Sequence, residues 1–388
     1  MKRTQLVVGS LAMLLFCFSM VAIAGEKPTV DIDWYGYFKL DGSYDQNLTS
    51  HGNFVMWVNP SSDDHQFNMT VKQTRLGFDA IGSGYGNAVV KGKLEMDLYG
   101  NATVENKSEL MLRLAYFSIQ SGNTMLLAGQ GWDLISPLNP PTLNYAVLWG
   151  CGNAQYRRPQ VSLFQTFKVG SSTKATLAGG FFRNMGSDLI PLSFSLADGE
   201  TSDGNDDGTD AAIPSIQGRL DINHDFASGA KLNLGVSGLW GQLKAETNLG
   251  NSSTYKSWAA CGHFMLSLKS GMGLSGEAYT GSNLASYLGG IANNNTFDGV
   301  GAVGGWASAW VQATPKVKLS TGFGIDTPNK DDVSNNSRSN NQCFFGNFTY
   351  ALVPGASVGL ELSQWQTEYK NVDTYSSFRA QTSFILNF

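Results

Sequence analysis

The sequence is poor in charge, in cysteine and in long apolar runs, and each shortage excludes a class of protein. Only 15% of the 388 residues are charged, and the formal net charge is −5. Proteins that bind nucleic acid usually present an excess of Lys and Arg, so this class is not favoured. Four cysteines at irregular spacing form no disulfide framework. Beyond the first 24 residues there is no uninterrupted run of about 18 apolar residues, so we expect no membrane-spanning helix.

Glycine and aromatic residues, in contrast, are plentiful. The chain has 45 glycines, and aromatic residues make up 12% of it. The glycines do not recur at every third position, which excludes a collagen. The aromatic content argues against a disordered chain. Length alone allows two or three soluble domains or one large barrel, and the composition favours the barrel.

The first 24 residues have the three parts of an export signal. A positively charged start is followed by the apolar stretch 6–23 and by the small-residue cleavage motif at 22–24. A membrane anchor is the competing interpretation, but polar residues follow at once. Lipid attachment at Cys17 is a second alternative, although phenylalanines flank that residue. We expect a signal peptide over 1–24 and an exported domain over 25–388.

Most of the exported chain alternates between apolar and polar residues with a period of two. The pattern is clear over 31–44, 88–99, 216–223, 316–326 and 377–388. Because successive side chains of a β-strand point to opposite faces, each segment would have one apolar and one polar face. A half-buried strand of a soluble sheet would alternate in the same way. The repetition along the whole chain therefore carries the argument.

The connections between these segments are alternately short and long. We count about sixteen strand candidates, joined by short links near 82–84, 121–123, 170–172, 227–229, 270–271, 314–315 and 354–355. The long links run roughly over 47–66, 99–108, 130–155, 184–213, 246–255, 281–298, 327–341 and 366–374. Tight turns on one rim and long loops on the other are typical of bacterial outer-membrane barrels. We therefore predict an all-β fold, a closed transmembrane antiparallel β-barrel of about 16 strands whose two ends lie at the short-turn rim.

Aromatic residues occupy positions that suit this fold. The chain ends in Phe388, and an amphipathic final strand with a terminal Phe resembles the C-terminal signal that the barrel-assembly machinery recognises. Trp and Tyr near strand ends would form girdles at the membrane surfaces. The girdle candidates are Trp34, Tyr99, Tyr116, Tyr279, Tyr350 and Tyr375. The alternative is that these six rings belong to a core.

Four motifs resemble segments of sixteen-stranded bacterial porins. Residues 67–78 place an Arg before an apolar-Gly-Phe step, and 112–116 are similar to an R-x-A-Y strand. Residues 126–132 resemble the G-Q-x-W segment that leads into the third loop, and 157–160 resemble an R-x-P-Q strand start. Together they are most similar to the DcaP-like branch of the trimeric outer-membrane porins.

This resemblance implies a function and its setting. The third loop, here roughly Gln130 to Gln155, would fold into the lumen and form a constriction. The chain would form a homotrimer in the outer membrane of a Gram-negative bacterium, in contact with its lipid and lipopolysaccharide. Small hydrophilic solutes would diffuse passively through the water-filled lumen. The constriction loop would contribute Gln130, Trp132, Asp133, Asn139 and Tyr145.

Charged residues on the lumen side would set the selectivity of such a pore. The candidates are Arg75, Arg113, Arg157, Arg158, Lys39, Lys91, Lys93, Glu95, Asp97 and Asp133. A wall that contains Arg75, Arg113 and Arg158 and faces a nearly neutral loop would favour anions such as dicarboxylates. The local field outweighs the net charge, because the Debye length is about 8 Å. The alternative is that Glu95 and Asp97 balance the nearby arginines and leave the pore unselective.

One long link is strongly acidic. No basic residue lies between Arg183 and Arg219, while seven acidic residues do. Asp203, Asn205 and Asp207 match the first half of a calcium-binding loop, but the Glu expected at its twelfth position is a Pro. We expect a solvated outer loop, with weak calcium binding as the alternative and no other cofactor.

No catalytic constellation is recognisable in the sequence. Its four histidines have no Ser-His-Asp, H-E-x-x-H or haem-attachment context, so we expect no enzymatic activity. The competing functional class is a non-conducting surface barrel, such as an adhesin or a structural or partner-binding protein, whose long loops carry the function. The sequence does not decide whether Cys151 and Cys261 form a disulfide.

Overall fold

One large β-sheet dominates the molecule. The structure is a computed structural model that describes residues 29–388 except 62, 83–85, 103, 105–106, 188, 190–198 and 297. The expected signal peptide over 1–24 lies outside the described residues and stays a prediction. Within the described part, no helix is long and apolar enough to span a membrane.

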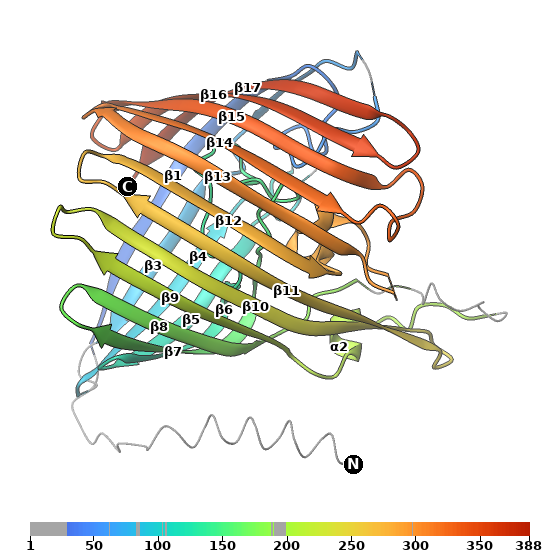
Figure 1. Ribbon diagram of the computed structural model, residues 1–388, viewed down its shortest axis with the longest axis horizontal. Coiled ribbons are helices and arrows are strands. Elements are labelled where there is room, and N and C mark those ends of the chain that lie inside the picture. The colour runs from blue at the N-terminus through green and yellow to red at the C-terminus, as the bar shows by residue number, and fades with distance from the viewer. Residues whose placement is uncertain are drawn as a thin grey trace.

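The sheet is antiparallel and closes on itself (Figure 1). The closing pair is β1 with β17, in register from Tyr37 opposite Asn387 to Asp45 opposite Arg379. The strands are β1 (Val30–Asp45), β2 (Gln66–Thr70), β3 (Arg75–Gly82), β4 (Ala88–Asp97), β5 (Met111–Ser121), β6 (Thr124–Trp132), β7 (Arg157–Val169), β8 (Thr173–Phe182), β9 (Ser215–Asp225), β10 (Lys231–Glu246), β11 (Ser252–Ser267), β12 (Met272–Ser282), β13 (Gly301–Thr314), β14 (Val317–Pro328), β15 (Arg338–Val353), β16 (Ala356–Tyr369) and β17 (Thr374–Asn387). Short helical segments α2 (Asp207–Asp210), η1 (Ala285–Tyr287) and η2 (Gly290–Ala292) lie in the connections.

β2 and β3 together occupy one strand position of the barrel. Both pair with β1, β2 from Asp41 onward and β3 up to Tyr37, so they lie along the same edge. The interruption at 71–74 buries Lys72, whose Nζ donates to the carbonyl oxygen of Asn101 over 2.8 Å. The barrel therefore has sixteen strand positions. The predicted closed antiparallel β-barrel of about 16 strands is confirmed.

The outer face of the barrel is apolar and the inner face is polar. On β1, Ile32, Trp34 and Phe38 are 51%, 61% and 59% exposed, whereas Lys39 and Asp41 are each 4% exposed. A soluble protein shows the opposite distribution. Transferring such an outer surface from water to acyl chains gains roughly 25 cal/mol per Å² of apolar area. The arrangement suits a lipid-facing barrel and argues against the soluble-sheet alternative.

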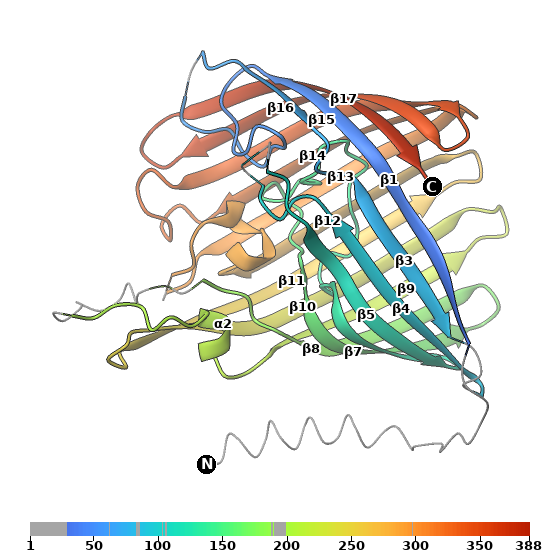
Figure 2. The same ribbon diagram turned by 180° about the vertical axis from the view of Figure 1, so that it is seen from behind.

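Short turns lie at one rim and long loops at the other, as Figures 1 and 2 show. Two predicted loops, 246–255 and 366–374, are wrong in length. β16 and β17 stay paired up to Glu368 opposite Thr374, which leaves only residues 370–373 between these strands. β10 and β11 stay paired up to Glu246 opposite Ser252, which leaves only residues 247–251 between them. Leu243, Ala245 and Tyr255 are buried together at this end of the hairpin. Their packing extends the strands beyond the point where turn-forming residues begin in the sequence.

Three long loops fold into the barrel. We call them the first loop (46–65), the third loop (133–156) and the sixth loop (283–300). Each contributes a fully buried apolar residue, Val55, Leu148 and Ile291 respectively. Val55 and Leu148 share a cluster with inward-facing rings of the wall, namely Trp306, Phe345 and Trp365. The half of the lumen nearest the long loops is therefore partly filled.

The predicted aromatic girdle holds only in part. Trp34 and Tyr350 are exposed on the outer face, but Tyr99 and Tyr279 are 4% and 3% exposed inside the barrel. Tyr279 occupies an inward position, two residues after the buried Glu277. A ring near a strand end thus belongs to the girdle only if its position in the alternation points outward.

The cysteines of the described chain are all free and buried. Cys151 and Cys343 belong to one apolar cluster, whereas Cys261 belongs to another. The structure therefore contains no disulfide between Cys151 and Cys261.

Candidate functional site

The third loop crosses the lumen between opposite walls of the barrel. It leaves the wall after Trp132, the last residue of β6, and returns at Arg157, the first residue of β7. Its two arms start side by side, because the amide of Asp133 donates to the carbonyl oxygen of Tyr156 over 2.9 Å. Figure 2 shows this segment, in green, inside the ring of strands.

Two glutamates on the far wall hold the loop. Glu277 of β12 accepts hydrogen bonds from Ser136 Oγ at 2.6 Å and from the amide of Leu138 at 2.8 Å. Glu361 of β16 accepts from the amide of Leu143 at 2.6 Å. The loop is therefore fixed at two points across the lumen from its origin.

Other strands hold the loop from further directions. Gln217 of β9 accepts from the amide of Leu134 at 2.7 Å. Lys39 of β1 and Gln381 of β17 both donate to the carbonyl oxygen of Leu143, at 2.8 and 3.1 Å. Contacts around most of the circumference give the loop one defined shape, as a constriction requires.

The returning arm of the loop lies directly against β13 and β14. Gly152 has a φ of +100°, and a Cβ at this position would lie 2.1 Å from the carbonyl oxygen of Gly305. The neighbouring Cys151 Sγ donates to the carbonyl oxygen of Gly324 at 3.3 Å. Only glycine combines this backbone conformation with this approach.

The arginines expected to line the wall are paired with acids. Arg113 of β5 donates from Nε to Glu95 at 2.8 Å and from Nη1 to Asp97 at 2.6 Å. The Arg113 side chain is 4% exposed, and Arg75 lies 3.5 Å from the same Glu95. A guanidinium buried in a wall of low dielectric constant requires such partners. Four charges on β3, β4 and β5 therefore cancel.

Arg158 is paired in the same way with the acid of the third loop. Its Nε lies 2.7 Å from Oδ1 of Asp133, and both side chains are fully buried. The ring of Tyr287, from the sixth loop, lies 3.9 Å from the guanidinium carbon. This ion pair fixes the base of the third loop and leaves neither charge facing the lumen.

The predicted lumen lysines differ in their surroundings. Lys39 lies 3.3 Å from Asp41 and is buried, and Lys93 lies 2.7 Å from Asp79. Lys91 is exposed near the short-turn rim and forms no ion pair with the described residues. Only Lys91 among these three lysines leaves an uncompensated charge.

Arg157 has aromatic rather than acidic neighbours. Its guanidinium carbon lies 4.7 Å from the ring centre of Tyr156 and 5.2 Å from that of Trp132. The side chain is 3% exposed, and its Nε and Nη1 have no hydrogen-bond partner among the described residues. Trp132 thus packs beside the loop base through a cation–π contact.

The remaining predicted loop residues stabilise the loop itself. Asn139 Oδ1 accepts from Gln155 Nε2 at 2.7 Å and so bridges the two arms. Tyr145 stacks on Tyr99 with ring centres 3.9 Å apart, and burial raises the pKa of Tyr145 to about 12, so its phenol stays neutral. Gln130 belongs to β6, where its Nε2 donates to the carbonyl oxygen of Leu112 at 2.8 Å.

The exposed guanidinium wall expected from the sequence is therefore absent from the described structure. The reason is register, because the acids of β4 face the same side as Arg113 of the next strand. Sequence reasoning also missed Glu277, Glu361 and Asp326, which accepts from the amide of Ile291 in the sixth loop at 3.2 Å. The alternation of apolar and polar residues places these three acids on the inner face, and this was the only sign of their role in the sequence. Nothing in the sequence showed that they bind loop amides rather than solutes.

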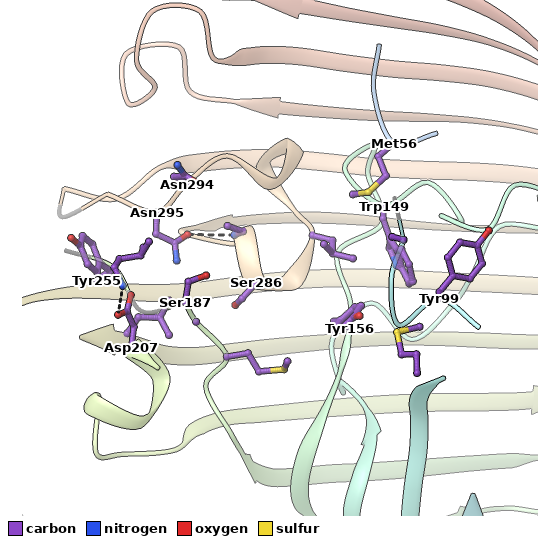
Figure 3. A pocket seen from close by; sticks show the side chains of 18 of the residues that line it. Met56, Tyr99, Trp149, Tyr156, Ser187, Asp207, Tyr255, Ser286, Asn294 and Asn295 are labelled. Carbon is purple, nitrogen blue, oxygen red and sulfur yellow. Dashed lines mark hydrogen bonds between the residues drawn. The ribbon is translucent and has the colours of Figure 1, made fainter. Parts of the chain in front are cut away.

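A cavity of about 440 Å³ opens towards the long-loop end, above the third loop (Figure 3). Tyr99, Trp149 and Tyr156 line one side of it, and Asn294 and Asn295 of the sixth loop line the other. Residues of the third loop and of the sixth loop therefore share this cavity.

The acidic loop adopts a local structure of its own. Asp203 is exposed and accepts from the amide of Asn205 at 3.0 Å, whereas Asp207 is buried and accepts from the amide of Leu189 at 3.2 Å. In the described residues, no group of three or more His, Cys, Asp or Glu side chains is arranged to hold a metal. Weak calcium binding by these residues stays an untested prediction.

Comparisons with known proteins identify the fold. No protein-family model matches the chain, and no curated protein sequence matches it. Among solved structures, the outer-membrane channel DcaP of Acinetobacter baumannii is similar with a TM-score of 0.68 and 18% identity, over 94% of this chain and 100% of that one.

Two further structures are similar at lower scores. An anion-selective porin from Comamonas acidovorans has a TM-score of 0.55 and 11% identity, over 93% of this chain and 100% of the porin. OmpT, an outer-membrane protein of Vibrio cholerae, in its trimer form has a TM-score of 0.56 and 10% identity, over 93% and 100%. At these identities the likeness is one of fold, and the fold is that of outer-membrane porins.

Proposed function

We propose that this protein is a passive diffusion channel for small hydrophilic solutes in the outer membrane of a Gram-negative bacterium. Water would fill the polar lumen, and solutes would be sorted by size at the third loop and by charge along the wall. No bond is made or broken in this mechanism, so we expect no enzymatic activity.

One observation carries the proposal. A loop of 24 residues crosses the interior of a closed barrel and is held there by buried carboxylates from the far wall. A barrel that acts only as a support for surface loops has no need of a tethered internal loop. A diffusion channel does need one, because a fixed constriction defines which solutes pass.

Two finer statements belong to the same proposal. The chain forms a homotrimer, supported by the trimeric state in which the similar OmpT was solved. The channel favours small anions such as dicarboxylates, supported by the similarity to an anion-selective porin. Arg75, Arg113 and Arg158 do not supply this preference, because acids neutralise them.

Planar-bilayer recording tests the function. Purified protein should insert with stepwise conductance increases, and liposomes that contain it should swell in solutions of small sugars, amino acids and di-acids. Insertion without conductance would contradict the proposal.

A non-conducting barrel is the second candidate, and one observation favours it. Val55 and Leu148 are buried in one apolar cluster inside the ring, and Ile291 is fully buried as well, which narrows the lumen at the long-loop end. An insulating protein whose exposed loops bind a surface or partner would support this second function instead.

A further inference from the structure

Two lysines face each other on the inner wall near the short-turn rim. Lys168 of β7 and Lys174 of β8 are direct cross-strand partners. Phe167, next to Lys168, is 51% exposed on the outer face, so Lys168 points inward. The next pair on the same inner face, Thr166 and Thr176, joins its hydroxyls at 3.0 Å. Both ammonium groups therefore project into the mouth of the lumen.

No acid of the described residues forms an ion pair with either lysine, although Asp225 lines the same space. In the part of the chain that the structure describes, neither lysine forms an ion pair or a side-chain hydrogen bond. The inward acid of the adjoining β9, Asp225, lies 3.9 Å from a third lysine, Lys231. Like charges directly opposite each other on antiparallel strands are destabilising, since their Cβ atoms are only about 5 Å apart. A pair of lysines without an ion-pair partner at this place calls for a functional explanation.

The lysines also line a cavity. It has a volume of about 590 Å³ and is lined by Lys168, Lys174, Thr166, Thr176, Asn223 and Asn233, together with Lys231 and its partner Asp225, among others. Hydroxyl and amide groups can donate hydrogen bonds to an anion. The volume falls within the range of about 300–1,000 Å³ that is usual for ligand sites.

Another inward acid of β9, Asp221, is opposite Thr176 and is already paired with Arg219 at 2.8 Å. The charges at the base of the third loop and on β3 lie further away. Ala178, which packs against Leu134 of the third loop, is four residues along β8 from Lys174, or about 14 Å at roughly 3.4 Å per residue. β3 and β7 are four strands apart, or about 19 Å at roughly 4.8 Å per strand. Both distances exceed a Debye length of about 8 Å.

We infer that Lys168 and Lys174 form a binding site for a small dianion at the short-turn mouth and that this site, not the third loop, sets the charge preference of the channel. One ammonium would contact each anionic group, and the threonine and asparagine side chains would complete the shell. The site would concentrate anions at one mouth and so favour their passage. The inference rests on the proposed channel function for its transport part, but not for binding.

The test compares the double variant K168Q/K174Q with the wild type in planar bilayers. We expect the ratio of chloride to potassium permeability, measured from the reversal potential in a KCl gradient, to fall at least about twofold in the double variant. The matched control is K269Q/K316Q, which removes the same charge from turns at the same rim and should keep the wild-type ratio. An unchanged ratio in K168Q/K174Q, with normal conductance, would overturn the inference and leave the channel function standing.

Calorimetry tests the site even if the protein does not conduct. Inorganic phosphate and succinate are titrated separately into the detergent-solubilised full-length protein. We expect both dianions to bind the wild type and the control, and neither to bind K168Q/K174Q. If only phosphate or only succinate binds, the site is specific for phosphate groups or for carboxylate groups, respectively. Absence of binding to the wild type, or equal binding to the double variant, would contradict the site.

Discussion

Arg158 and Asp133 form an ion pair of 2.7 Å in which neither side chain is exposed. One belongs to the start of β7 and the other to the first position of the third loop, so the pair closes the base of the loop against the wall. A charge without a partner at this depth is strongly unfavourable. The relationship therefore links the stability of the barrel to the position of the third loop.

Removal of this partnership should destabilise the protein. In D133N, Arg158 stays buried without an acid, and we expect a loss of about 3–5 kcal/mol in the free energy of unfolding. The measurement is the midpoint of thermal unfolding in detergent. D225N is the control, because Asp225 and Lys231 are 3.9 Å apart and mostly exposed. Equal midpoints for D133N and the wild type would refute the structural role.

Release of the loop from the far wall should change the channel. E361Q weakens the acceptor for the amides of Leu143 and Asn144. We expect larger and more variable single-channel conductance, because the loop is then held only through its other contacts. E368Q changes an exposed carboxylate of the same strand and should conduct as the wild type does. Identical conductance traces for all three proteins would show that Glu361 does not hold the constriction.

The balance of charge around Arg113 should be visible in ion selectivity. R113Q leaves Glu95 and Asp97 with one guanidinium fewer, so we expect the reversal potential in a salt gradient to shift towards cation preference. R113Q/D97N restores the local balance and should return the potential towards the wild-type value. A wild-type potential in R113Q would show that this cluster has no influence on permeating ions.

Gly152 should tolerate no side chain. A Cβ would lie 2.1 Å from the carbonyl oxygen of Gly305, so G152A must displace either the loop or β13. We expect a loss of at least about 2 kcal/mol in stability, with a lower yield of folded barrel. In G346A the added Cβ has no atom within 4 Å, and that variant should fold normally. Comparable yields for the two variants would contradict the close approach.

The terminal residue should matter more for assembly than for stability. Phe388 exchanges backbone hydrogen bonds with Gly36 at 3.1 and 3.2 Å, and its ring lies 5.4 Å from that of Phe38. We expect deletion of Phe388 to reduce the amount of barrel that reaches the membrane in cells, while refolding in detergent persists. F384A removes an equally exposed ring from the same strand, both being 52% exposed. If F384A impairs assembly in cells as much as the deletion, Phe388 is not a terminal signal.

Local sequence patterns were sufficient to predict the strands that form the wall of the barrel. Ile32, Trp34 and Phe38 alternate with polar residues, and this period of two predicts which face each side chain occupies. The wrong length at 246–255 has a different cause. Turn-forming residues are present there, but burial of Leu243 and Tyr255 keeps the two strands paired up to Glu246 opposite Ser252, so only 247–251 form the turn.

The interior was harder to predict, because it depends on contacts between distant residues. The sequence shows that Arg113 and Glu277 face inward, but their partners come from a neighbouring strand and from a loop more than 130 residues away. An inward acid that binds a loop amide has the same local sequence as one that faces a solute. Only the positions of three loops in space distinguish the two roles.

The contact of the first loop with β16 has a consequence for the order in which the barrel assembles. The amide of Val58 donates to Thr367 Oγ1 at 2.9 Å, and the hydroxyl of Tyr369 donates to the carbonyl oxygen of Val58 at 2.8 Å, across 309 and 311 positions of chain. The loop is synthesised early, but β16, which receives it, is made almost last. Contacts between such remote positions form slowly. Val58 can reach these partners only after β16 has been made, so its burial reports a late stage of folding.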